Sequence, residues 1–201
     1  MSFKKYGMAV AVAMALSAGS AVAAGSDTGT ITFHGMVSNN TCQVSLDQKI
    51  DQKGNDFDVT LDTVKVADFT SALGTTSTLG EKKFSLSLTG CDYETVKKVS
   101  AQFDSWAGSS STEGGLLVPP GNAQGSAKNV NLVLSNASST ATDQIKVDQV
   151  NNTQKADISA AGAANLYYRV AYTQGQGWNA TSNPVSAGTV QAQVAFTMQY
   201  E

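Results

Sequence analysis

The chain has 201 residues, a formal net charge of −3 at neutral pH and only 14% charged residues. This length is enough for one domain with a proper core and does not require two. The acidic balance and the lack of a basic patch argue against nucleic-acid binding. Polar Ser, Thr, Asn and Gly residues separate short apolar alternations, and only 3 prolines occur, which is typical of an all-β domain with polar turns.

The first segment has the layout of a secretory signal peptide. Lys4 and Lys5 precede an apolar run, and small residues follow at positions 21–24, in the order that export signals require. The apolar run is too short to span a bilayer. We therefore expect residues 1–24 to be removed on export, with the exact cleavage bond left open, and the mature chain to reach an oxidising compartment.

Directly behind this signal comes a short alternating segment. Its odd-numbered residues share one apolar face of an extended chain, opposite a face that carries Thr32, His34 and Met36. The residues of the apolar face are Ile31, Phe33, Gly35 and Val37. The sequence shows no obvious partner for this strand, and an exposed apolar edge strand invites pairing with another chain. We hypothesise that such pairing is its function; the alternative is a self-paired first strand in a complete sandwich.

Only two cysteines occur, Cys42 and Cys91. In an exported protein the default is a single disulfide between them. A metal or redox site is the alternative, but there is no Cys-x-x-Cys motif and His34 is the only histidine. Residues 84–88 alternate Phe, Leu and Leu just before Cys91, so the predicted disulfide ties this strand to the one that starts at Cys42.

Further alternating segments follow the same pattern along the chain. One or two short strands are predicted within residues 58–69, and others at residues 99–103, 130–134 and 166–172. The long polar interval 135–164 has few apolar residues, so we expect one short strand and mobile turns there, exposed on the outer surface.

The last strand is the most regular. Its apolar residues fall on even positions from Val190 to Tyr200, and Gly188 continues that face. Seven or eight short strands, no convincing amphipathic helix and a cross-strand disulfide predict a β-sandwich. A terminal strand this apolar needs a neighbour, and we expect no later strand to supply one.

Four segments carry a resemblance to a known family. They are the Gly-Thr-Ile-Thr-Phe-His-Gly-Met-Val stretch at 29–37, Cys42 just behind it, the Phe-x-Leu-x-Leu-x-x-Cys strand at 84–91 and the C-terminal Phe-Thr-Met-Gln-Tyr-Glu at 196–201. Together they resemble chaperone–usher pilins, most closely the major shaft subunits of type 1 and type 3 fimbriae. The resemblance covers essentially the whole mature chain and includes the penultimate Tyr200, Gly188 and the strand glycine Gly35.

The resemblance implies an all-β, incomplete immunoglobulin-like β-sandwich that is completed by donor-strand exchange. Residues 25–38 would be the N-terminal donor-strand extension and residues 39–201 the pilin domain, with a groove beside the C-terminal strand. A periplasmic chaperone strand would fill this groove until the extension of the next pilin subunit replaces it at the outer-membrane usher. The donor residues would be Ile31, Phe33, Gly35 and Val37. The groove and chaperone-binding residues would be Gly188, Val190, Val194, Phe196, Met198 and Tyr200.

Burial energies agree with that assignment. Burying Ile31, Phe33 and Val37 contributes about 5–9 kcal/mol before ordering costs, whereas a whole domain is stable by about 5–15 kcal/mol. A subunit without its donor is therefore expected to be marginal or unfolded, and a polymer joined in this way to dissociate very slowly.

Sites for other functions are missing from the sequence. His34 is the only imidazole, and Gly-x-Ser-x-Gly motifs, zinc-ligand spacings and phosphate-binding glycine loops do not occur. We therefore expect no catalytic residue, cofactor, metal or small-molecule substrate. The resemblance implies export through the periplasm and a location at the cell surface as a fimbria. The alternative is a secreted single-domain carbohydrate-binding module that holds a sugar with Trp106, Trp178 and tyrosines.

Overall fold

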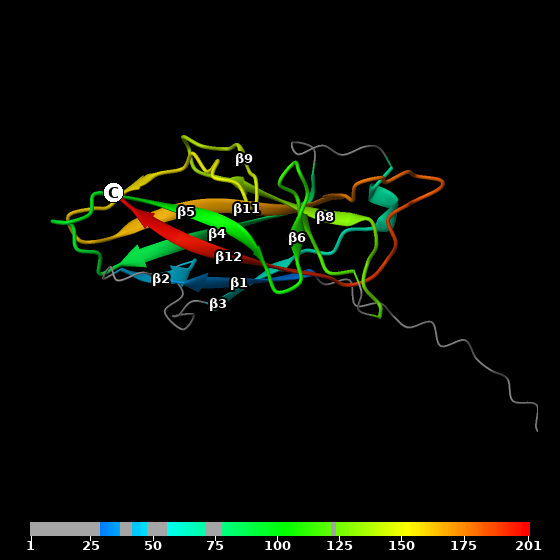
Figure 1. Ribbon diagram of the computed structural model, residues 1–201, viewed down its shortest axis with the longest axis horizontal. Helices are drawn as coiled ribbons and strands as arrows, with labels where there is room; N and C mark the ends of the chain where they lie inside the picture. The colour runs from blue at the N-terminus through cyan, green and yellow to red at the C-terminus, as the bar shows by residue number, and fades with distance from the viewer. Residues whose placement is uncertain (1–28, 37–41, 48–55, 71–77, 122–123) are drawn as a thin grey trace, which may run out of the picture.

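The alternating segments assemble into two β-sheets that enclose one hydrophobic core (Figure 1). The computed structural model describes residues 29–36, 42–47, 56–70, 78–121 and 124–201. Of the twelve strands in these residues, four contain only two residues, and the other eight agree with the number expected from the sequence. The predicted all-β sandwich is thus confirmed. The one helical element described is a single 3-10 turn, η1 (Val66–Asp68), and no helix in this part of the chain could cross a membrane.

The first sheet has five strands in the order β10-β5-β12-β1-β3. Their bounds are β10 (Ala156–Asp157), β5 (Lys98–Trp106), β12 (Val190–Tyr200), β1 (Gly29–Met36) and β3 (Asp56–Leu61). The second sheet follows the path β2-β4-β11-β8-β7-β6, with β9 paired to β8. Its bounds are β2 (Gln43–Leu46), β4 (Leu79–Thr89), β11 (Ala164–Gln174), β8 (Val130–Asn136), β7 (Leu117–Val118), β6 (Ser110–Ser111) and β9 (Gln144–Ile145).

The core forms where the alternating faces of the two sheets meet. Tyr168 of β11 is fully buried, and its ring centroid lies 5.0 Å from that of Phe103 and 5.5 Å from that of Phe84. These three rings come from β11, β5 and β4, so they join the two sheets. Burial raises the pKa of the Tyr168 phenol far above its ordinary value, because the charged form would lose its hydration.

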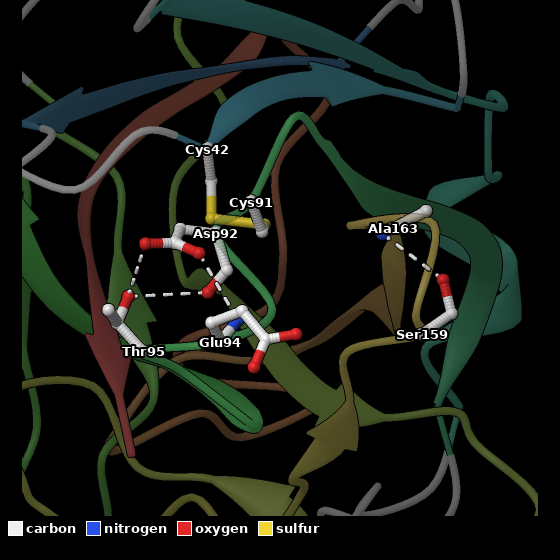
Figure 2. Close-up of a disulfide and its surroundings, with 7 residues drawn as sticks. All are labelled: Cys42, Cys91, Asp92, Glu94, Thr95, Ser159 and Ala163. Atoms are coloured by element: carbon white, nitrogen blue, oxygen red, sulfur yellow. Dashed lines mark hydrogen bonds between the residues drawn. A yellow bond between two sulfur atoms is a disulfide. The ribbon is translucent and has the colours of Figure 1, made fainter.

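The predicted disulfide is present between Cys42 and Cys91, with a sequence separation of 49 residues (Figure 2). Cys42 precedes β2, which among the described strands is an edge strand paired with β4, and Cys91 follows β4. The turn behind Cys91 is held by Asp92, whose carboxylate accepts hydrogen bonds from the Thr95 hydroxyl at 3.0 Å and the Glu94 amide at 3.1 Å. The disulfide therefore anchors the outer strand of one sheet to a rigid turn.

The polar interval 135–164 differs from its prediction. Of its large apolar residues, Ile145, Val147 and Ile158 are buried and Val150 is exposed, while the polar Gln154 is only 3% exposed. The Gln154 side chain donates to the Tyr167 carbonyl at 2.8 Å and accepts from the Tyr167 amide at 2.8 Å. One amide side chain thus replaces a strand neighbour along β11, so this interval is packed into the domain rather than exposed as mobile turns.

Replacing Gln154 with alanine is expected to lower the free energy of unfolding by about 2–4 kcal/mol. The change leaves the Tyr167 amide and the Asn136 side-chain oxygen, 2.9 Å from the Gln154 amide, without this partner, whereas the Tyr167 carbonyl keeps its hydrogen bond from the Ala137 amide. A buried unpaired polar group costs about 1–3 kcal/mol. Denaturant unfolding measures the loss. The control is the exposed Gln149→Ala, and an equal effect of both variants would contradict the prediction.

Candidate strand-pairing site

The N-terminal strand β1 lies between β12 and β3. It runs parallel to β12 from Gly29 opposite Val190 to Met36 opposite Thr197, and antiparallel to β3. Within this sheet β3 has no other strand neighbour, and without β1 the strand β12 would be paired only with β5. The expectation that β1 lacks a partner within its own chain is therefore wrong for a single chain, and its pairing with a second chain stays a prediction.

The register places the odd-numbered residues of β1 opposite buried residues of both neighbouring strands. Ile31, Phe33 and Gly35 stand opposite Ala192, Val194 and Phe196 of β12, all of which are buried. On the other side, Ile31 and Phe33 stand opposite the buried Val59 and Phe57 of β3. Because opposite residues in a sheet share a face, both neighbours agree with the apolar face expected for Ile31, Phe33 and Gly35. Val37, the fourth predicted residue, lies outside the described residues.

Two aromatic rings meet across β1. Phe57 of β3 and Phe196 of β12 stack with their centroids 5.9 Å apart and their planes at 14°, although β1 separates the two strands in the sheet. Gly35 stands opposite Phe196, and a residue without a side chain permits such a close approach. Sequence reasoning missed Phe57, although its alternation with Val59 and Leu61 would have revealed it.

The residues predicted to line the groove divide into two groups. Val190, Val194, Phe196 and Met198 are buried on the core face of β12, whereas Tyr200 is only partly buried at its end. Gly188 has a different neighbour: a Cβ at this position would lie 2.4 Å from the Ala127 amide nitrogen. Its structural role is thus to let two backbone segments approach, and its part in the groove stays a prediction.

A pocket of about 270 Å³ continues the site beyond the end of β12 at which β1 begins. Val190 and Gly188 line it next to the strand. Its other apolar side chains include Val64, Phe69, Val130, Tyr172 and Val185. An apolar pocket therefore adjoins the end of β12 at which β1 begins.

No cluster of three or more side chains suited to holding a metal ion occurs in the described parts of the chain. The two tryptophans considered for a sugar site also differ in their surroundings. Trp106 at the end of β5 is 51% exposed, whereas Trp178 packs against the core with its indole nitrogen buried. They do not form one exposed aromatic surface, and the geometry favours strand pairing over a carbohydrate-binding module.

Comparisons with known proteins point in one direction. The profile of the family described as fimbrial protein matches residues 31–201. Long polar fimbria protein A of Salmonella typhimurium is 31% identical over 190 residues, which cover 94% of this chain and 93% of the relative. Among solved structures, the CupB6 tip adhesin from Pseudomonas aeruginosa aligns with a TM-score of 0.46 and 15% identity, over 67% of this chain but only 38% of the adhesin chain. That weak likeness adds nothing to the assignment.

The family match spans most of the chain, and the curated relative is matched over nearly its whole length. Proteins of this family are surface proteins that polymerise with one another into fimbriae. The chain therefore belongs to the fimbrial protein family, as a structural subunit of a chaperone–usher fimbria.

Proposed function

We propose that β1 is a donor strand, which leaves its own subunit and fills the place between β12 and β3 of the next one. The sheet order carries this proposal: β3 joins the first sheet only through β1, and β12 needs β1 as its second neighbour. The strand that fills this place is the first strand of the described chain, and residues 37–41 join it to the body. Such a strand can be supplied by another copy without disturbing the rest of the domain.

The chain topology sets the direction of the exchanged strand. Within one chain, β1 runs parallel to β12, so both strands point toward the end of the sandwich marked C (Figure 1). If β1 turns outward while its end at Met36 stays near the body of the subunit, it extends beyond that end of the sandwich. In a head-to-tail fibre it then lies antiparallel to β12 and parallel to β3 of the neighbour, the reverse of the two pairings in the single chain. Alternation with period two is unchanged by this reversal, so the odd-numbered residues still face the core.

This proposal includes a route of assembly. Residues 1–24 direct export and are removed, residues 25–38 form the donor extension, and residues 39–201 form the pilin domain. A periplasmic chaperone covers the open place beside β12, and the outer-membrane usher exchanges it for the next subunit. The protein would have a purely structural role, without catalysis, cofactor or small-molecule substrate. The energy of strand burial would then make fibre growth effectively irreversible.

Deleting residues 25–37 tests the proposal when the chain is expressed with its periplasmic chaperone. We expect the truncated subunit to remain bound to the chaperone and to form no ladder of polymers on unboiled SDS gels. In the full chain, Phe33→Gln should also block ladders because it places an amide on the core face, whereas the matched Thr32→Gln on the other face should not. Polymerisation of the truncated chain, or its folding as a stable monomer without chaperone, would refute donor-strand exchange.

Paired cysteines separate the two directions of the strand. Thr30 stands opposite Gln191 in the single chain, so Thr30→Cys with Gln191→Cys should crosslink within a monomer. In an antiparallel exchanged strand, residue 30 lies near the other end of β12. Thr30→Cys with Thr197→Cys should therefore crosslink neighbouring subunits in the fibre. Crosslinking of the first pair only, in monomer and fibre alike, would contradict the antiparallel exchange.

A further inference from the structure

We propose that Asp56 and Asp58 of β3 select the incoming donor strand by charge and favour one with a cationic residue at position 34. This inference rests on the proposed donor-strand exchange, and it names the kind of strand that the site accepts. It concerns the face of the sheet opposite the core. Apolar burial cannot discriminate between strands there, because the side chains on that face are not packed into the interior.

The register brings the charges together. His34 stands opposite Asp56 of β3, and Thr32 stands opposite Asp58. Asp56 and Asp58 are exposed and alternate with the buried Phe57, so both belong to the outward face, as do the even-numbered residues of β1. Residues directly opposite each other in an antiparallel pair are close enough to interact, and like charges there destabilise the pair.

On the outward face of the sheet, the described residues of β12 and β5 place no positively charged side chain opposite position 34. On the β12 side, Ala195 stands opposite His34, and its neighbours on that face are Gln193 and Thr197. One strand further, Asp104 of β5 stands opposite Ala195. The lysine of β5 on this face is Lys98, at the first residue of the strand, and its ammonium lies 3.2 Å from the Asp157 carboxylate. Across the sheet, position 34 therefore lies between the carboxylates of Asp56 in β3 and Asp104 in β5.

Reversing the strand does not remove this preference. The even-numbered residues of β1 face outward in either direction, and Asp56 and Asp58 belong to the subunit that receives the strand. Any exchanged strand must therefore place its outward residues beside these two carboxylates. A carboxylate at position 34 would be repelled, whereas lysine or a protonated histidine would be attracted.

Histidine makes the preference depend on pH. The imidazole is protonated below its ordinary pKa of about 6.5, and only the protonated form is attracted by the carboxylates. The extra stabilisation is therefore present below the histidine range. It is lost as the pH rises through the histidine range.

Full-length chains with substitutions at position 34 test the inference through the rate of strand release in urea at low salt, because an uncharged denaturant does not screen the charge pair. We expect the native chain to dissociate roughly two- to fivefold more slowly at about pH 5.5 than at about pH 8, the range of a cross-strand charge pair. His34→Gln should remove this difference, and His34→Lys should be slow at both values. Asp56→Asn with Asp58→Asn should also remove it. An unchanged pH dependence in either His34→Gln or the double asparagine variant would overturn the inference.

Mixed assembly tests the selection itself. Fibres grown from equal amounts of His34→Lys and His34→Glu chains should contain an excess of the lysine chain, and this excess should reverse when Asp56 and Asp58 are both replaced with lysine. Equal incorporation would overturn the inference while leaving donor-strand exchange intact. If donor-strand exchange itself fails, no fibre forms from either chain, so the two failures are distinguishable.

Discussion

Replacing Phe196 with alanine is expected to lower the free energy of unfolding by about 3–5 kcal/mol, the usual range for removing a buried aromatic side chain. Phe196 is fully buried in β12 and stacks on Phe57 across β1. The substitution opens a cavity and also removes the ring contact between the two strands that flank β1. Denaturant unfolding of the purified chain measures the loss.

The same substitution should weaken the hold on the donor strand. Gly35 stands opposite Phe196, so the ring lies beside the position at which β1 lacks a side chain. Polymers of Phe196→Ala should therefore dissociate in SDS at a lower temperature than native polymers. The control is Thr197→Ala, at the exposed position next to Phe196 in β12. It should change the free energy of unfolding by no more than about 0.5 kcal/mol and leave the dissociation temperature of the polymers unchanged. Equal effects of the two variants would show that the ring pair does not stabilise the site.

Replacing both cysteines with serine is expected to lower the free energy of unfolding by about 4 kcal/mol. The disulfide spans 49 residues, and a bond across a loop of this length removes a large amount of chain entropy from the unfolded state. Cys42 also fixes the start of β2, which pairs only with β4, so the loss should be seen first as opening of this outer strand. Hydrogen exchange of β2 amides and denaturant unfolding measure the two effects.

Reduction of the native protein supplies the control for that substitution. Cys42→Ser with Cys91→Ser should match the reduced native chain in unfolding midpoint, because both lack the same bond. If the double variant were as stable as the oxidised protein, the constraint on the unfolded chain would not be the source of stability. Polymer formation is expected to survive at low temperature, since neither cysteine belongs to β1, β3 or β12.

Local alternation predicted much of the fold. The core faces of β4, β11 and β12 follow the period of two seen in the sequence, because each strand residue has only two possible sides and apolar residues choose the buried one. The pairing of Cys42 with Cys91 followed from having just two cysteines in an exported chain. The shared apolar face of Ile31, Phe33 and Gly35 was predicted from the same local alternation. The family was predicted from sequence motifs, which include those near both ends of the chain.

Contacts between distant segments could not be predicted in this way. Nothing in the local pattern around Gln154 shows that its amide pairs with the backbone of Tyr167 in β11. Phe57 contacts Phe196 across a third strand that lies between them in the sheet. Asp56 stands opposite His34 only because β3 and β1 are neighbours.

The sequence by itself determined which residues alternate, which cysteines pair, and that an apolar alternating segment precedes Cys42. Only the tertiary structure decided where that strand lies, in which direction it runs, and which carboxylates it meets. The physical reason is that periodicity depends on neighbouring residues, whereas strand order and register depend on pairings between segments far apart in the chain. The place between β12 and β3 is therefore a property of the folded sheet.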